Sequence, residues 1–233
     1  MEKIGFIGVG HMGRPIAAGL AQAGYEVLAY DVYPKALESV KGLKTEILDD
    51  IALHAEVIIT MLPSAHELLS IYEPGTRFFQ EIRPDALLID CSTIGPIASK
   101  QWHQLPFATV DAPVSGGIIA AQNNQLTYMM GGHPEDVLKA QTILQKIAKQ
   151  IIVTGGPGTG QMAKICNNLI LGNTMIAVSE GFLLGEKLGL DPKKLHEVLE
   201  LSSGHSWVTE KYLPVPDIID NVPANHQYHA GFS

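Results

Sequence analysis

The chain has 233 residues, of which 46% are hydrophobic and 17% charged, and its formal net charge is −8 at pH 7. This composition is typical of a globular protein with a well-filled core and excludes a disordered or fibrous chain. The negative balance, without a cluster of Lys and Arg, argues against a nucleic-acid partner, because binding phosphates requires clustered cations.

The cysteines and the apolar segments indicate the cellular compartment in which the protein is expected. Cys91 and Cys166 lie in apolar segments without metal-ligand spacing, and we interpret them as reduced core residues of a cytoplasmic protein. The N-terminus enters a strand pattern at once, without a charged leader or cleavage site. The longest apolar stretch, residues 169–184, is interrupted by Asn173 and Glu180 and is not expected to span a membrane.

Short apolar runs alternate with segments of helical periodicity over the first two thirds of the chain. Strands are predicted at residues 4–8, 26–30, 57–61, 87–90, 107–111, 127–130 and 150–153. Helices are predicted most clearly at residues 12–23, 65–79 and 134–148. This alternation predicts an α/β fold with a doubly wound, mainly parallel sheet covered on both faces.

The pattern changes at the glycine-rich turn 154–160. A long apolar helix is predicted from 161 to 188, followed by a short helix from Asp191 to about residue 201 and an irregular tail. We therefore predict two domains, residues 1–157 and an all-α domain at 158–233. Because so few elements cannot close a core alone, the second domain is expected to be incomplete or completed by another subunit, with a homo-oligomer formed through the long helix.

A glycine motif follows the first predicted strand directly and opens a helix. Its residues are Gly8-Val9-Gly10-His11-Met12-Gly13. The first glycine permits a tight turn, the second lets a pyrophosphate approach the backbone, and the third lets helix and strand pack closely. The backbone N–H groups of His11 and Met12 would then point at the phosphates with the helix dipole behind them. The motif in this position predicts a Rossmann-type dinucleotide-binding domain.

Asp31 ends the second predicted strand, close to the spacing expected for the residue that binds the adenosine ribose. A carboxylate there accepts hydrogen bonds from the ribose hydroxyls and repels a 2′-phosphate. No arginine follows in Val32-Tyr33-Pro34-Lys35, so NAD is predicted in preference to NADP.

Two further loops follow strands of the same predicted sheet, Met61-Leu62-Pro63-Ser64 and Asp90-Cys91-Ser92-Thr93. Ligands of open α/β sheets bind beyond the carboxyl ends of the strands, so both loops are candidates to cover the nicotinamide half of the cofactor. For Leu62-Pro63 alone, simple termination of a strand is the alternative.

The segment Asp111-Ala112-Pro113-Val114-Ser115-Gly116-Gly117 ends another strand. Ser115 offers a hydroxyl, and Gly116 and Gly117 expose backbone N–H groups, a combination that suits a small carboxylate. A glycine-rich turn without a ligand is an equally good interpretation of this segment taken alone.

Lys164, Asn167 and Asn168 lie in the first turns of the predicted apolar helix, with Lys164 and Asn168 on one face. Polar groups in such a helix must face a polar site or a partner, because burying them unpaired costs several kcal/mol. The alternative is that Lys164 extends to solvent and the asparagines cap neighbouring loops. A lysine whose pKa falls from about 10.4 to about 7–8 is able to remove a hydroxyl proton as hydride leaves for a nicotinamide.

The histidines do not indicate a metal site. His226 and His229 lie in a polar tail without further ligands, and His103, in an apparent loop or on a helix face, needs no functional account. Trp207 and Tyr212 are candidates either to wall a substrate pocket or to pack in a core.

These motifs together resemble the β-hydroxyacid dehydrogenase family over essentially the whole chain. The matching segments are Gly5-Phe6-Ile7-Gly8-Val9-Gly10-His11-Met12-Gly13, Tyr30-Asp31-Val32, Ile59-Thr60-Met61-Leu62-Pro63, Asp90-Cys91-Ser92-Thr93-Ile94, Asp111-Ala112-Pro113-Val114-Ser115-Gly116-Gly117, and Gly158-Thr159-Gly160-Gln161 continuing to Lys164-Ile165-Cys166-Asn167-Asn168. A late stretch, residues 202–216, is most similar to the branch that acts on 3-hydroxyisobutyrate.

The resemblance implies NAD-dependent oxidation of 3-hydroxyisobutyrate to methylmalonate semialdehyde, a step of valine catabolism. Reduction of tartronate semialdehyde, or of succinic semialdehyde or glyoxylate, is the alternative within the family. The implied roles are catalysis by Lys164, substrate binding by Ser115, Gly116, Gly117 and Asn168, and cofactor binding by the glycine turn, Asp31, Leu62, Pro63 and Thr93. No metal is implied.

Family members continue beyond the position of Phe232, through a helical region that supplies another lysine near the cofactor. We therefore expect the helical domain to be truncated here. A non-catalytic NAD-binding module is the alternative function from another class.

Overall fold

The structure is a computed structural model that describes residues 2–38, 44–45 and 47–229. It falls into two compact units, one within Met1–Ile165 and the other within Cys166–Phe232. Helix α9 (Thr159–Lys187) gives its first turns to unit 1 and its remainder to unit 2.

Unit 1 is built on one sheet, and the strands that the structure describes in it are β1 (Lys3–Ile7), β2 (Glu26–Tyr30), β3 (Lys44–Thr45), β4 (Val57–Thr60), β5 (Leu87–Asp90), β6 (Ala108–Asp111), β7 (Val114–Ser115), β8 (Leu126–Gly132) and β9 (Ala148–Gly155). The strand order is β3-β2-β1-β4-β5-β6-β8-β7, with β9 paired to β8. The pairs from β3 to β6 are parallel, and β8 is antiparallel to β6. The order 3-2-1-4-5-6 is that of a dinucleotide-binding sheet, so the predicted fold class is confirmed.

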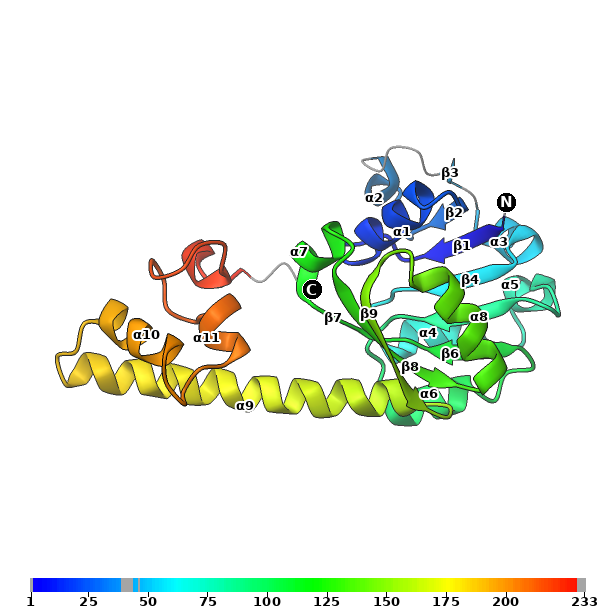
Figure 1. Ribbon diagram of the computed structural model, residues 1–233. Helices are drawn as coiled ribbons and strands as arrows, with labels where there is room; N and C mark the ends of the chain where they lie inside the picture. Colours follow the sequence, from blue (N-terminus) through cyan, green and yellow to red (C-terminus); the bar gives the residue numbers. More distant parts are fainter. Residues whose placement is uncertain (1, 39–43, 46, 230–233) are drawn as a thin grey trace. The chain divides into compact units, whose positions relative to one another are not determined.

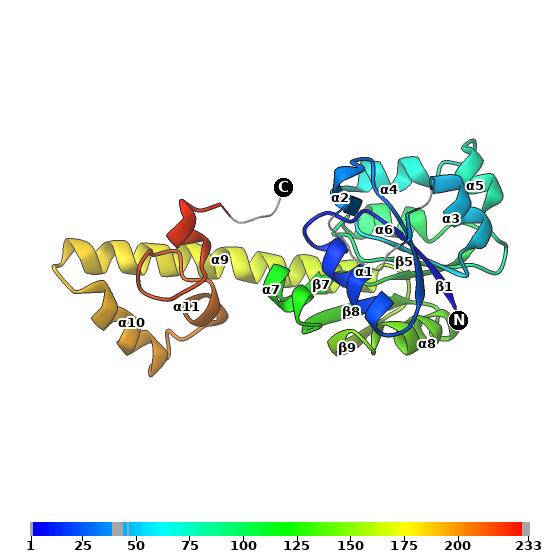
Figure 2. The same ribbon diagram turned by 90° about the horizontal axis from the view of Figure 1, so that it is seen from above.

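Helices cover both faces of this sheet (Figure 1). They are α1 (Gly13–Gln22), α2 (Lys35–Glu38), α3 (Leu48–His54), α4 (Ala65–Ile71), α5 (Arg77–Glu81), α6 (Pro96–Trp102), α7 (Gly117–Gln122) and α8 (Pro134–Leu144). One buried cluster joins α1 and α8 to the sheet, and another joins α3, α4, α5 and α6 to its opposite face. Figure 2 shows α1 and α8 on the side opposite α3, α4 and α5. Successive strand residues such as Ile58 and Ile59 alternate between the two clusters, as the two-residue period of a strand requires.

The helix predicted over residues 65–79 is wrong as a single element. The structure breaks it into α4 and α5 at the segment around Pro74, which cannot continue a helix because it lacks the N–H donor. Thr76 is the N-cap of α5, and its hydroxyl oxygen accepts a hydrogen bond from the N–H of Phe79 at 3.2 Å. The helix predicted to reach residue 148 ends at Leu144, and the following strand begins at Ala148.

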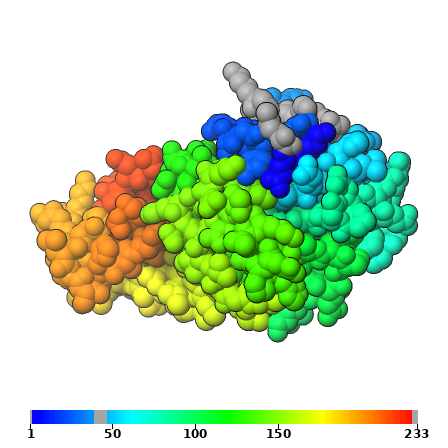
Figure 3. Space-filling model, turned by 45° about the vertical axis from the view of Figure 1, so that its right-hand side comes forward, coloured from blue at the N-terminus to red at the C-terminus, as the bar shows by residue number. Residues whose placement is uncertain are grey.

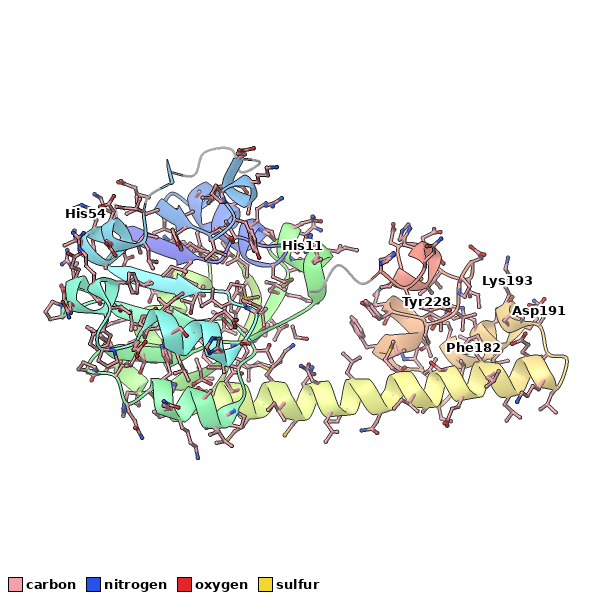
Figure 4. The ribbon with its side chains drawn as sticks, turned by 180° about the vertical axis from the view of Figure 1, so that it is seen from behind. His11, His54, Phe182, Asp191, Lys193 and Tyr228 are labelled. Carbon is pink, nitrogen blue, oxygen red and sulfur yellow. The ribbon has the colours of Figure 1, made fainter. Side chains whose placement is uncertain are left out.

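Unit 2 contains the rest of α9, with α10 (Pro192–Glu200), α11 (Trp207–Lys211) and the 3₁₀ helix η1 (Pro223–His226). Asp191 caps α10 through the N–H of Lys193, at 2.8 Å (Figure 4). Gly185 lets α10 approach α9, since an added Cβ would lie 3.0 Å from Leu195 Cδ2. The buried apolar residues described in this unit are Phe182, Val208, Leu213, Val222 and Ala224.

Helix α9 carries a large exposed apolar surface along its unit 2 part. Leu169 is 66% exposed and Ile170 is 68% exposed, and the yellow atoms of the helix reach the surface in Figure 3. Cys166 is also exposed, so its expected place in a core is wrong, whereas Cys91 is buried as expected. By length and composition alone, α9 is apolar enough to cross a membrane, although the core helix of a soluble protein passes the same test.

Candidate functional site

The glycine turn after β1 has the geometry that a dinucleotide requires. Gly8 has φ +91°, and a Cβ there would lie 2.3 Å from the carbonyl oxygen of Met61. A Cβ on Gly13 would lie 1.9 Å from the carbonyl oxygen of Gly8, so only glycine lets α1 begin this close to the turn. A Cβ on Gly10 would meet nothing within 4 Å. The protein's own packing therefore does not require glycine at position 10, and the open backbone there is free to approach a phosphate.

Asp31 is held against this turn by two backbone hydrogen bonds. Its Oδ2 accepts from the N–H of Val9, and its Oδ1 accepts from the N–H of Tyr33, both at 2.8 Å. The carboxylate therefore lies beside the glycine turn, half-buried, where the ribose of a bound dinucleotide is expected. His11, exposed on the same turn, is labelled in Figure 4.

The loops after β4 and β5 are tied together by a buried carboxylate. Asp90 Oδ1 accepts hydrogen bonds from the hydroxyl of Thr60 at 2.8 Å and from the hydroxyl of Ser92 at 2.6 Å. The oxygen of Ser92 in turn accepts from the N–H of Leu62 at 2.8 Å. The two loops predicted to cover the nicotinamide half thus form one unit, on which Pro63 and Thr93 are exposed.

The two oxygens of the Asp90 carboxylate differ in their hydrogen bonding. Its Oδ2 is buried and has no hydrogen-bond partner among the described residues. Burial in a low-dielectric environment raises the pKa of the carboxyl from 3.8 to about 6, and the bonds from Ser92 and Thr60 oppose this rise.

The segment after β6 places Ser115 on β7, paired with Thr127 of β8. Gly116 and Gly117 follow with φ +135° and φ +73°, and a Cβ on Gly117 would meet nothing within 4 Å. Among the described residues, no hydrogen bond joins this segment to Lys164. The role of Ser115, Gly116 and Gly117 in binding a carboxylate therefore stays a prediction.

The start of α9 is fixed by Asp111, at the end of β6. Its Oδ1 accepts from the N–H of Gly158 and its Oδ2 from the N–H of Gln161, both at 2.8 Å. A negative charge at a helix N-terminus is stabilising, because it pairs with N–H groups that lack partners within the helix. His103 Nε2 lies 2.8 Å from Asp111 Oδ1, a contact that the sequence does not indicate.

Lys164 lies in the next turn of α9. Its side chain is partly buried, and burial lowers the pKa of its amine below the usual value. This is the direction that a general base at neutral pH requires. Asn167 and Asn168 follow on the part of α9 that belongs to unit 2, where Asn168 is exposed and accepts a hydrogen bond from Asn167 at 3.4 Å.

The links made by Gln161, Asp111 and His103 were not found from the sequence. Gln161 and Asp111 depend on partners far away along the chain, Gln161 on Ser92 and Asp111 on Gln161, whereas His103 contacts Asp111, which is near it in the sequence. The one signal present was the polar Gln161 at the start of an apolar helix, where burial requires partners.

The strand order, the glycine turn and Asp31 define a dinucleotide-binding protein. A family model described as the NAD binding domain of 6-phosphogluconate dehydrogenase matches residues 3–155. A second, described as NAD-binding of NADP-dependent 3-hydroxyisobutyrate dehydrogenase, matches residues 158–233.

Individual relatives agree with both models. The chain is 41% identical to mitochondrial 3-hydroxyisobutyrate dehydrogenase of Bos taurus, over 98% of this chain and 70% of that protein. It is 36% identical to the NAD-dependent L-serine dehydrogenase of Pseudomonas aeruginosa, over 100% of this chain and 80% of that protein. The solved 3-hydroxyisobutyrate dehydrogenase of Mycobacterium tuberculosis with L-serine superposes with a TM-score of 0.89 at 35% identity, covering 100% of this chain and 81% of that one.

The chain belongs to the 3-hydroxyisobutyrate dehydrogenase family, as its motifs predict, and is an NAD(P)-binding oxidoreductase.

Proposed function

We propose that this protein oxidises 3-hydroxyisobutyrate to methylmalonate semialdehyde with NAD, as a step of valine catabolism, and that Lys164 is its general acid/base. The observation that carries the proposal is the half-buried amine of Lys164, with its lowered pKa, on the helix whose start is hydrogen-bonded to the Ser92–Gly95 loop. Relatives named for 3-hydroxyisobutyrate support the substrate.

The proposed step moves a proton and a hydride from one carbinol group. Bound NAD supplies the hydride acceptor, the nicotinamide ring. The neutral amine of Lys164 takes the hydroxyl proton of the substrate, and in the reverse direction the ammonium returns it to the carbonyl oxygen. Ser115, Gly116 and Gly117 hold the carboxylate of the substrate, and Asn168 holds its reacting oxygen or that carboxylate.

Asp31 supports the preference for NAD over NADP. Both of its oxygens are fixed by backbone N–H groups, so the carboxylate cannot easily turn away from a 2′-phosphate. Leu62, Pro63 and Thr93 complete the cofactor site in this proposal, on loops joined through Ser92.

The test is replacement of Lys164 in the protein as it exists. Lys164→Ala is expected to lower kcat by about 10²–10⁴-fold, the usual contribution of a general acid/base, while the Kd for NADH measured by fluorescence changes little. Lys187→Ala, on the exposed end of the same helix, is the matched control. A large loss of NADH affinity in Lys164→Ala would count against the acid/base role.

L-Serine is a second candidate substrate, because it is also a 3-hydroxy acid and because relatives are named for it or bind it. Steady-state rates with 3-hydroxyisobutyrate, L-serine, glycerate and 4-hydroxybutyrate discriminate these substrates and the reductase alternatives. NADH binding without turnover of any of them would instead favour a non-catalytic NAD-binding module.

We also propose that a second copy of the chain covers the exposed apolar surface of α9. Contiguous exposed apolar patches of this kind mark interfaces, and the exposed members on this helix include Leu169, Ile170, Ile176, Leu183 and Leu184. Light scattering is expected to give a dimer or a larger oligomer, and Leu169→Glu with Ile176→Glu is expected to shift it towards the monomer. A monomer for the unsubstituted protein would refute this assignment.

A further inference from the structure

The side chain of Gln161 connects the start of α9 to the 92–95 loop. The proposed function assigns the first of these segments to the substrate and the second to the cofactor. Gln161 is the third residue of α9 and is 0% exposed. Its Oε1 accepts hydrogen bonds from the N–H groups of Ile94 at 3.1 Å and Gly95 at 3.2 Å. Its Nε2 donates to the carbonyl oxygen of Ser92 at 2.7 Å. One side chain therefore forms hydrogen bonds with three backbone groups of the 92–95 loop.

The backbone of Gln161 is fixed as firmly as its side chain. Its N–H donates to Asp111 Oδ2 at 2.8 Å. The preceding residue, Gly160, packs directly on β8, because a Cβ there would lie 2.3 Å from the carbonyl oxygen of Met129. The first turn of α9 therefore cannot slide along its axis without breaking buried contacts.

The two segments joined in this way carry the groups that have to meet. The 92–95 loop contains Thr93, and through Ser92 it also holds the backbone of Leu62. Lys164 lies three residues after Gln161, about one helical turn further along α9. The amide of Gln161 thus directly links the loops assigned to the nicotinamide to the helix assigned to the proton.

We propose that Gln161 is a positioning residue that sets the distance between the amine of Lys164 and the nicotinamide-covering loops. The inference rests on the proposed function. It requires that loosening the link impairs hydride transfer more than cofactor binding, since the glycine turn and Asp31 hold the adenosine half independently of Gln161.

The position requires an amide side chain, because its oxygen has to accept hydrogen bonds and its nitrogen has to donate one. In Gln161→Glu the carboxylate still accepts from Ile94 and Gly95 but opposes the carbonyl of Ser92. In Gln161→Met a side chain of similar length leaves all three backbone groups unpaired, which makes it the stronger perturbation. Gln104→Glu, at an exposed glutamine of unit 1, is the matched control.

The kinetic test measures kcat, the Kd for NADH, and the primary deuterium isotope effect with substrate labelled at the hydroxyl-bearing carbon. Turnover is expressed per NADH-binding site, so that unfolded molecules do not count. We expect kcat to fall about 10–100-fold in both variants, because small misplacements of reacting groups have effects of this size, while Kd changes less than about 3-fold. The isotope effect is expected to be at least as large as in the unsubstituted protein, since hydride transfer is the step that is slowed.

A second measurement does not depend on turnover. Amide hydrogen exchange is followed by mass spectrometry in peptides that cover residues 92–95 and 158–165, with and without NADH. In the unsubstituted protein NADH is expected to slow exchange in both peptides. In Gln161→Met the loop peptide is expected to respond still, whereas the helix peptide is expected to lose its response.

The outcomes separate this inference from the proposed function. If the unsubstituted protein oxidises no hydroxy acid, the proposed function fails and the exchange experiment alone decides the role of Gln161. An unchanged kcat per binding site, a smaller isotope effect, or a helix peptide that still responds to NADH in Gln161→Met would each overturn the positioning role.

Discussion

The buried carboxyl of Asp90 is expected to make the folded protein less stable as the pH rises. Burial raises its pKa in the folded state to about 6 from its ordinary value of 3.8. A carboxyl with a raised folded pKa binds its proton more tightly when folded, so stability is lost as the pH rises through the window between these two values. The whole shift corresponds to about 3 kcal/mol, of which about 1.4 kcal/mol falls between pH 5 and pH 8.

Asp90→Asn removes this titration at small geometric cost. The amide oxygen can replace Oδ1, which accepts from Thr60 and Ser92, and the amide nitrogen can take the place of the partnerless Oδ2. The free energy of unfolding of the variant minus that of the unsubstituted protein is therefore expected to increase by about 1.4 kcal/mol from pH 5 to pH 8. Taking this difference cancels the titration of all other groups.

Urea unfolding of the ligand-free protein, followed by tryptophan fluorescence, measures this difference. A Trp207→Phe background leaves the buried Trp102 of unit 1 as the only tryptophan. Asp85→Asn, at an exposed aspartate just before β5, is the control and is expected to show no such trend, because the hydrogen bond from Arg83 lowers the pKa of that carboxyl and keeps it ionised from pH 5 to pH 8. A difference that stays constant from pH 5 to pH 8, or that falls, would refute the reasoning.

Three further substitutions test the cofactor turn and the start of α9. Gly13→Ala is expected to prevent folding of unit 1, since its Cβ would overlap the carbonyl oxygen of Gly8. Gly10→Ala is expected to fold normally, as measured by circular dichroism, and to lose NADH affinity. Equal effects of the two substitutions on folding and on NADH affinity would contradict the assignment. Asp111→Asn is expected to destabilise by about 2–4 kcal/mol in urea, because one buried N–H donor would face an amide instead of an oxygen, and a loss below about 0.5 kcal/mol would contradict this. Asp31→Ser is expected to raise the Kd for NADH about 10-fold and to reduce the NAD/NADP selectivity, with an unchanged selectivity as the contrary result.

The sequence predicts those parts of the molecule whose signal is local. The glycine turn and Asp31 were identified because the turn must contain glycine at Gly8 and Gly13 whatever surrounds it. The sequence predicts the parallel strands because strands buried on both faces are continuously apolar, as residues 57–59 and 87–89 are. Short helices such as Pro96–Trp102 were missed, because seven residues carry too little periodicity.

The polar network around Gln161 was beyond prediction for a different reason. Ser92 and Gln161 are 69 residues apart, and only the folded sheet brings them together. His103 is a different case, because both of its partners are near it in the sequence: its ring nitrogens lie 2.8 Å from Asp111 Oδ1 and 2.7 Å from Thr109 Oγ1, and no local pattern indicates these contacts. Pattern analysis finds residues that are required by their own backbone, and it overlooks residues that are required by side-chain contacts formed only in the folded chain.

Asp90 and Asp111 show how neighbouring positions with the same side chain are given different roles. They are register partners at the ends of β5 and β6. Both oxygens of Asp111 accept hydrogen bonds from the start of α9, whereas only one oxygen of Asp90 has partners among the described residues. The same Asp-to-Asn change is therefore destabilising at position 111 but relieves an uncompensated buried charge at position 90. The strand ends that carry the site thus contain one carboxylate that holds the α9 helix and one that lowers stability, while Ser92 and Gln161 connect the two.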